Sequence, residues 1–331
     1  MRPAVPTDHI MRNTLLRMAG LTALAFCCAV SAAESAWPPP GKPVQIAVLS
    51  PAGGSIDAPL ARLLAEKLTA YLNVPFTFIG TSTHTVSQPN NVLQLVLTGI
   101  GMQTTRPGTY RATPLDPRAH YLPVGLVAQF PSIIAVTKML PVNSLDEFTR
   151  YLRLNPGVVN VASSGNGSVS NMADMLFMTL TDTNMVPVTF SSTGQATSNL
   201  ISGEIQSMFH LAPDIADQVK QQEVKALAIM GDKRLSILPQ VPTTAELGHP
   251  ALRASLWLGL MAPKDTPPET IERANAALND ILADPEVIAR MASMGATPQG
   301  GTPQELDRRL SAELAKWQAL LTNGYAPPPF P

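Results

Sequence analysis

The stretch VVNVASSGNGSVSNMADMLFMTLTDTNMVPVTF, residues 158–190, contains the pattern on which the fold depends. The apolar run 158–162 predicts a buried strand, and 163–168 is a turn rich in glycine and serine. Apolar residues recur at helical spacing over 169–180, and 186–190 reads as a second strand. A strand, a turn, a helix and a strand in this order predict a parallel βαβ unit.

The same order of elements occurs earlier in the chain. Residues 44–49 (VQIAVL) predict a buried strand, 51–54 (PAGG) break it, 56–72 predict a helix and 74–79 a strand. Further alternation predicts a helix over 194–202, a strand over 205–209, a helix over 213–222 and a strand over 225–230. This rhythm predicts an α/β fold with parallel sheets in doubly wound lobes. Residues 106–123, rich in proline and arginine, predict a loop.

The N-terminus has the composition of a secretory signal peptide. Two arginines precede an apolar run over 18–30, and small residues follow at 31–33. The apolar run is too short to cross a bilayer as a helix. We therefore predict that 1–33 is cleaved and that the mature protein is periplasmic. Cleavage after Ala36 and a true start at Met11 are the alternatives.

Composition excludes several classes of protein. The 331 residues are 45% hydrophobic and 14% charged, with a formal net charge of −1, so the chain is neither disordered nor a membrane bundle. No basic run with interleaved aromatic residues is present, so nucleic acid is not an expected partner. Both cysteines, Cys27 and Cys28, lie in the leader, and the histidines lack metal-ligand spacing. We expect no cofactor and no metal.

Both glycine-containing turns lead from a strand into a helix. Backbone N–H groups at a helix start attract anions, so two such turns facing one cleft would hold a carboxylate without lysine or arginine. Alternatively, each is only a tight turn. Asp57, in the first turn of its helix, either caps that helix or accepts a hydrogen bond from a ligand.

A set of short motifs resembles the Bug-type solute-binding receptors of the tripartite tricarboxylate transporter family. The motifs, in order along the chain, are PAGGSID (51–57), VASSGNGS (161–168), STGQA (192–196), SGEIQSMF (202–209), VKALAI (224–229), LPQVPTTAELG (238–248), WLGLMAP (257–263), TPPETI (266–271) and ADPEVIARMASMGATPQGGTPQEL (283–306). The resemblance implies a two-lobe periplasmic binding fold (type II) that closes on a small carboxylate. On that basis lobe 1 comprises 38–130 plus 257–331, and lobe 2 comprises 131–256.

The resemblance also implies ligand-binding residues. Those carried over are Ala52, Gly53, Gly54, Ser55, Asp57, Ser163, Ser164, Gly165, Asn166, Gly167, Ser168, Thr193, Gly194 and Gln195. The chain departs from the family at two places. His210 replaces an acidic residue, and 80–91 lacks the usual glycine-rich motif and is shortened. His210 follows a predicted strand end, which in open α/β sheets faces the ligand, so we include it in the site.

The resemblance implies a monomer that passes a small organic acid to membrane transporter subunits, or reports it to a sensor kinase, without acting as an enzyme. Two alternatives stay open. One is a secreted hydrolase that uses a serine of 163–168, which requires a base beside that serine. The other is a degenerate family member that binds no metabolite, which the altered segment 80–91 favours.

Overall fold

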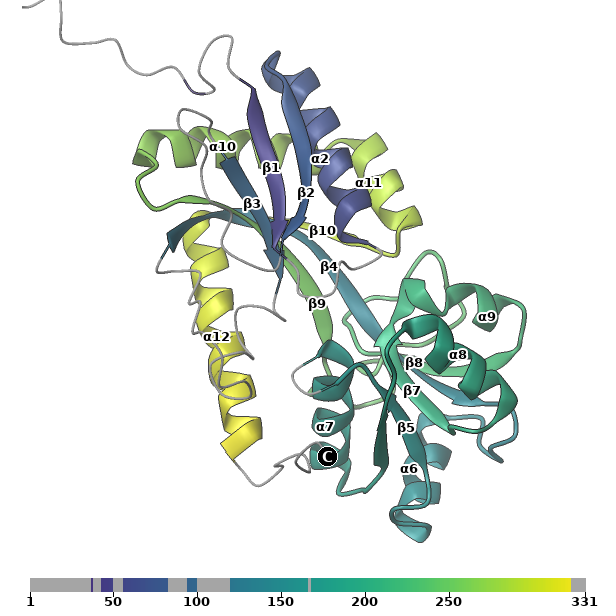
Figure 1. The fold of residues 1–331 in the computed structure, drawn as a ribbon. Helices are drawn as coiled ribbons and strands as arrows, with labels where there is room; N and C mark the ends of the chain where they lie inside the picture. Colours follow the sequence, from purple (N-terminus) through teal and green to yellow (C-terminus); the bar gives the residue numbers. More distant parts are fainter. Residues whose placement is uncertain are drawn as a thin grey trace, which may run out of the picture. The chain divides into compact units, whose positions relative to one another are not determined.

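The computed structural model describes residues 37, 43–49, 56–82, 94–99, 120–165 and 168–322 (Figure 1). Its strands are β1 (Val44–Leu49), β2 (Phe76–Ser82), β3 (Gln94–Gly99), β4 (Tyr121–Thr137), β5 (Asn160–Ser163), β6 (Val186–Thr189), β7 (Ser207–Leu211), β8 (Val224–Ile229), β9 (Ser255–Pro263) and β10 (Thr297–Gly300). Its helices are α2 (Asp57–Leu72), α6 (Leu145–Leu154), α7 (Val169–Thr181), α8 (Thr193–Ser202), the 3-10 helix η1 (Ala212–Asp214), α9 (Ala216–Lys220), α10 (Pro268–Leu282), α11 (Pro285–Ser293) and α12 (Pro303–Thr322).

Both predicted βαβ units are present. Strand β1 pairs in parallel with β2 and with β3, and β5 pairs in parallel with β6 and with β7. Helix α2 buries the apolar positions that the sequence spaced along one face, among them Leu60, Leu64 and Leu68. It ends at Asn73, whose φ of 52° lies in the left-handed region that stops a helix.

The expectation of parallel sheets throughout is wrong, because two long strands run antiparallel through the molecule. The strand order is β2-β1-β3-β9-β4-β7-β5-β6, with β8 and β10 also paired to β4. Strand β4 pairs antiparallel with β9 over Tyr121–Pro131 and with β7 over Ser132–Val136. Tyr121 and Pro123 were expected in a loop but lie in β4. The prolines of β4 masked the strand in the sequence, and Pro123 sits beside a register shift that accommodates it.

The sheet formed by β4, β7, β5 and β6 is covered on both faces. Successive residues of β7 point to opposite faces of the sheet, and each face has its own apolar core. Phe209 belongs to one apolar cluster and Met208 to the other. The first cluster includes Phe148 of α6 and Phe177 of α7, and the second includes residues of α8 and α9. This part of the chain is therefore doubly wound, as the sequence predicted. Figure 1 shows α2, α10 and α11 grouped with β1 to β3, and α6 to α9 grouped with β5, β7 and β8.

The C-terminal helices begin where Pro267-Pro268, Asp284-Pro285 and Thr302-Pro303 mark helix starts in the sequence. Each of α10, α11 and α12 has a proline as its first residue, where the missing N–H has no helical partner to lose. Ion pairs join α2 to α11, with Glu66 bound to Arg290 at 2.6 Å and Lys67 to Glu286 at 2.5 Å. These contacts are exposed, so they orient the helices more than they stabilise the fold.

Candidate functional site

The turn after β5 is held by its own hydroxyls. The N–H of Ser164 donates to Ser170 Oγ at 3.0 Å, and the N–H of Gly165 donates to Ser163 Oγ at 3.2 Å. Ser168 caps α7 by accepting from the Asn171 N–H at 3.2 Å. Gly165 has a φ of +96°, which L-residues rarely adopt. The turn therefore presents side-chain hydroxyls, because the N–H groups of Ser164 and Gly165 are already donated within it.

His210 brings three separate segments together. The sequence predicted a strand over 205–209, which would place His210 just beyond its end. In the structure β7 runs over Ser207–Leu211, so His210 lies inside the strand. Period two along β7 places His210 on the face of Met208, which packs against α8. Its Nε2 lies 3.5 Å from Ser164 Oγ and 3.4 Å from Thr193 Oγ1. The structure thus groups Ser164 and Thr193, which the resemblance implied, with His210, which the sequence analysis added from its place after a predicted strand.

Asp214 is a further member of this cluster that the sequence analysis missed. Its Oδ2 lies 2.8 Å from His210 Nδ1, and both side chains are 14% exposed. Nδ1 makes no hydrogen bond of good geometry within the described residues, so the carboxylate approaches the ring off the N–H direction. The contact becomes an ion pair when the imidazole is protonated. The four-residue spacing from His210 to Asp214, directly after a strand, was the available signal in the sequence.

The start of α8 borders the same cluster. Ser192 caps the helix by accepting from the Gln195 N–H at 3.3 Å. The N–H groups of Thr193 and Gly194 belong to the first turn, where a helix supplies no acceptor. The helix macrodipole places partial positive charge at this end. This edge therefore combines a helix N-terminus, two hydroxyls and an imidazole, which together suit an anionic or strongly hydrogen-bonding group.

The structure describes only some of the other residues that the resemblance implied. Asp57 is the first residue of α2 and is 3% exposed. Ala52 to Ser55, together with Asn166 and Gly167, lie outside the described residues, as does most of the altered segment 80–91. The structure therefore groups Ser164, Thr193 and His210, with Gly194 and Gln195 beside them on α8.

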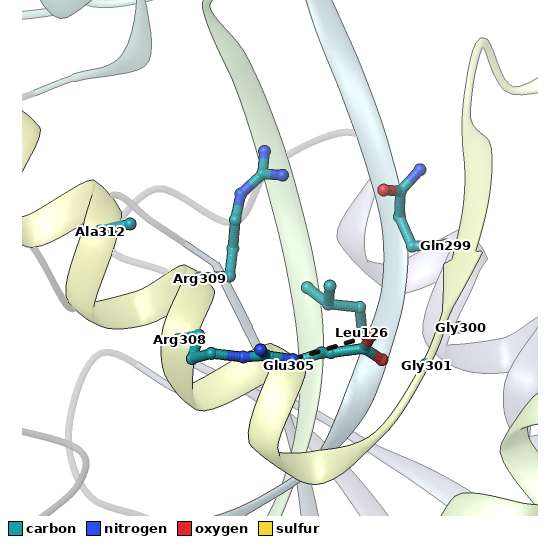
Figure 2. Close-up of a pocket in the computed structure, with 8 residues that line it drawn as sticks. All are labelled: Leu126, Gln299, Gly300, Gly301, Glu305, Arg308, Arg309 and Ala312. Carbon is teal, nitrogen blue, oxygen red and sulfur yellow. Dashed lines mark ion pairs between the residues drawn. The ribbon is translucent and has the colours of Figure 1, made fainter.

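A separate pocket lies between β10 and the start of α12 (Figure 2). Its volume is about 600 Å³, and its lining consists of Leu126, Gln299, Gly300, Gly301, Glu305, Arg308, Arg309 and Ala312. Gln299 and Arg309 face it from opposite sides, and Glu305 pairs with Arg308 at 3.8 Å. None of the implied ligand-binding residues lines this pocket. Its two arginines are matched by Glu305 and by Glu313, which lies 3.6 Å from Arg309.

The described residues also bear on two other kinds of site. Within them, no group of three or more His, Cys, Asp or Glu side chains is arranged to hold a metal ion. In the same ranges, no helix is long and apolar enough to span a membrane.

Comparison with known proteins identifies the family. Residues 79–324 match the model described as "Tripartite tricarboxylate transporter family receptor". This chain belongs to that family of receptors. Among its relatives is the protein BugT of Bordetella pertussis, 29% identical over 303 residues, covering 88% of this chain and 92% of BugT. The Bug-type resemblance drawn from the motifs is thereby confirmed.

Solved structures of family members confirm the two-lobe periplasmic binding fold. An R. palustris protein solved with adipate aligns with a TM-score of 0.73 at 26% identity, covering 87% of this chain and 98% of that one. MatC from Rhodopseudomonas palustris, solved with bound malate, aligns with a TM-score of 0.65 at 26% identity, covering 85% of this chain and 99% of MatC. The family consists of solute-binding receptors rather than enzymes.

Proposed function

We propose that this chain is an exported receptor that captures a small carboxylate between two lobes and delivers it to the membrane subunits of a tripartite transporter. The observation that carries the proposal is the meeting of Ser164, Thr193 and His210 beside the start of α8. Relatives with the same fold were solved with adipate and with malate, both dicarboxylates. A cluster of hydroxyls, an imidazole and helix N–H groups complements such a ligand. Reporting to a sensor kinase is the alternative route after capture.

The proposed lobes follow the change of partners along β4. Residues of β4 up to Pro131 pair with β9, and those from Ser132 pair with β7. This supports a lobe 1 of 38–130 plus 257–331 and a lobe 2 of 131–256. We place export on residues 1–33, which N-terminal sequencing of the periplasmic protein would check. We also propose that the receptor is a monomer, with the 51–57 turn supplying the lobe 1 side of the site.

One contact supports the hydrolase alternative, and three other observations oppose it. His210 Nε2 does lie near Ser164 Oγ, where a general base would stand. However, Thr193 Oγ1 is equally close to Nε2, and the Asp214 carboxylate is not aligned with Nδ1. The Ser164 and Gly165 N–H groups, which could otherwise hold an oxyanion, donate within the turn. We therefore assign the cluster to binding, and a bound ester should be recovered unchanged after prolonged incubation.

A thermal-shift screen of small carboxylates against the mature protein tests the proposed function. At least one mono- or dicarboxylate should raise the melting temperature by several degrees, because a ligand at a hundred times its Kd stabilises the folded state by about 2.7 kcal/mol. Matched alcohols and amines of the same carbon skeleton are the controls. If no carboxylate shifts the transition, the degenerate member without a ligand becomes the better interpretation.

Replacing Gly194 by alanine should separate binding from folding. No atom lies within 4 Å of a Cβ added at Gly194, and alanine favours a helix over glycine by ~1 kcal/mol, so stability should hold or rise. Affinity for the carboxylate found in the screen should nevertheless fall about tenfold, because the added methyl group covers the N–H groups of the first turn. Ser198→Ala, one turn further along the same exposed face, is the matched control. Unchanged affinity in Gly194→Ala would remove the start of α8 from the site.

A further inference from the structure

His210 Nε2 is placed between two hydroxyls without a close bond to either. Its distances to Ser164 Oγ and Thr193 Oγ1, 3.5 and 3.4 Å, exceed the roughly 2.7–3.0 Å of a well-formed bond involving a hydroxyl. The three atoms come from the turn after β5, from the start of α8 and from β7. We call these three atoms, His210 Nε2, Ser164 Oγ and Thr193 Oγ1, the rim of one polar site. Of the three, only the ring nitrogen changes its protonation state.

The protonation state of His210 decides what this rim offers a ligand. A neutral ring with its proton on Nδ1 leaves Nε2 as an acceptor, so one of the two hydroxyls must direct its proton to Nε2. A protonated ring donates through Nε2 and leaves both hydroxyl protons free for the ligand. A carboxylate only accepts hydrogen bonds, so it fits the protonated rim and competes poorly for the neutral one.

One charged side chain lies against the His210 ring, opposite the two hydroxyls. Asp214 Oδ2 lies 2.8 Å from Nδ1, on the side of the ring away from the rim. Ser164, Thr193 and the strand neighbour Ile133 of β4 also lie beside the ring, and they carry no charge. An anion arriving at Nε2 and the carboxylate at Nδ1 would together hold an imidazolium between two negative groups.

From this arrangement we infer that capture of a carboxylate is coupled to uptake of a proton by His210. The inference rests on the proposed function and adds to it a regulation of the same site by pH. Asp214 is the positioning residue, because it contacts the ring and lies behind the rim. The site then selects ionised carboxylates over neutral isosteres, and it binds them more tightly in an acidified periplasm.

Calorimetry with adipate and malate as probes measures the coupling directly. Titrations at about pH 7 in phosphate and in Tris, which differ in ionisation enthalpy, give the number of protons taken up on binding. We expect net uptake by the wild type and none by His210→Gln. Histidine is the side chain that changes charge between about pH 5 and pH 8, so a site that requires imidazolium gains about tenfold in affinity from about pH 7.5 to about pH 5.5. That gain should be absent from His210→Gln.

Two further variants make the result specific. Asp214→Asn should still bind but reach its highest affinity at lower pH, because the charge behind the ring is gone. His249→Gln is the matched control, because His249 faces Asp146 at 3.6 Å elsewhere on the surface, and it should keep the wild-type profile. The same pH profile in the wild type and in His210→Gln would overturn the inference while leaving the receptor function standing. Failure of the wild type to bind any carboxylate would overturn the receptor function, and this inference with it.

Discussion

Replacing Phe177 by alanine is expected to lower the free energy of unfolding by about 3–5 kcal/mol, the usual cost of emptying a buried aromatic site. Phe177 is fully buried in α7 and lies between two other rings. Its centroid is 5.8 Å from that of Phe148 in α6 and 5.2 Å from that of Phe209 in β7. The side chain therefore helps pack α6 and α7 against the central sheet. Its removal leaves a cavity that the surrounding close-packed side chains cannot easily fill.

Urea denaturation followed by circular dichroism measures this loss. Leu180→Ala is the matched control, because Leu180 lies on the same helix but is 49% exposed, and it should cost much less than Phe177→Ala. Because Phe209 directly precedes His210, we also expect the variant to bind carboxylates more weakly where it remains folded. A loss below ~1 kcal/mol would mean that the three rings do not act as one packed unit.

The second large effect is expected at Asp174, also in α7. Its side chain is fully buried, and among the described residues its carboxyl group has no hydrogen-bond partner beyond a contact with its own backbone N–H. Burial raises the pKa of Asp174 well above its ordinary value, because the charged form is deprived of solvent. The folded protein therefore holds a proton that the unfolded chain releases.

The sign of the pH dependence follows from this proton. Between the ordinary pKa near ~4 and the raised pKa of the folded state, the native state binds more protons, so stability falls as pH rises. The loss is about 1.4 kcal/mol for each pH unit in that window. Asp174→Asn stays neutral at every pH. It should match the wild type near pH 4 and become the more stable protein by pH 7.5.

Urea midpoints between pH 4 and pH 8 test this expectation. Asp182→Asn serves as the control, because this exposed carboxylate at the end of the same helix should change stability by less than ~0.5 kcal/mol. Parallel curves for the wild type and Asp174→Asn across the whole range would show that Asp174 has a partner when the protein is folded. If Asp174→Asn is more stable than the wild type only at high pH, the ionised Asp174 has no compensating partner in the fold.

Features that depend on neighbouring residues could be predicted from the amino-acid sequence. Helical spacing of apolar residues predicted α2 and α7, and prolines marked the starts of α10 to α12, because these signals lie within one or two turns of the chain. Ser168 and Ser192 cap their helices through hydrogen bonds to N–H groups three residues further along the chain, which is an equally local interaction. The ordered motifs were also sufficient to identify the receptor family, which the family match confirms.

Which of these residues come into contact depends on how the strands and helices pack. Ser164 and His210 are 46 positions apart, and their contact depends on the register of β7 against β4 and β5. A shift of one residue would turn His210 into the aromatic core and Phe209 toward α8. The antiparallel course of β4 and β9 was equally hidden, because long-range pairing leaves no local period and prolines interrupt the strand. The contact between Asp214 and His210 could not be predicted either, because contacts between separate elements depend on how those elements pack.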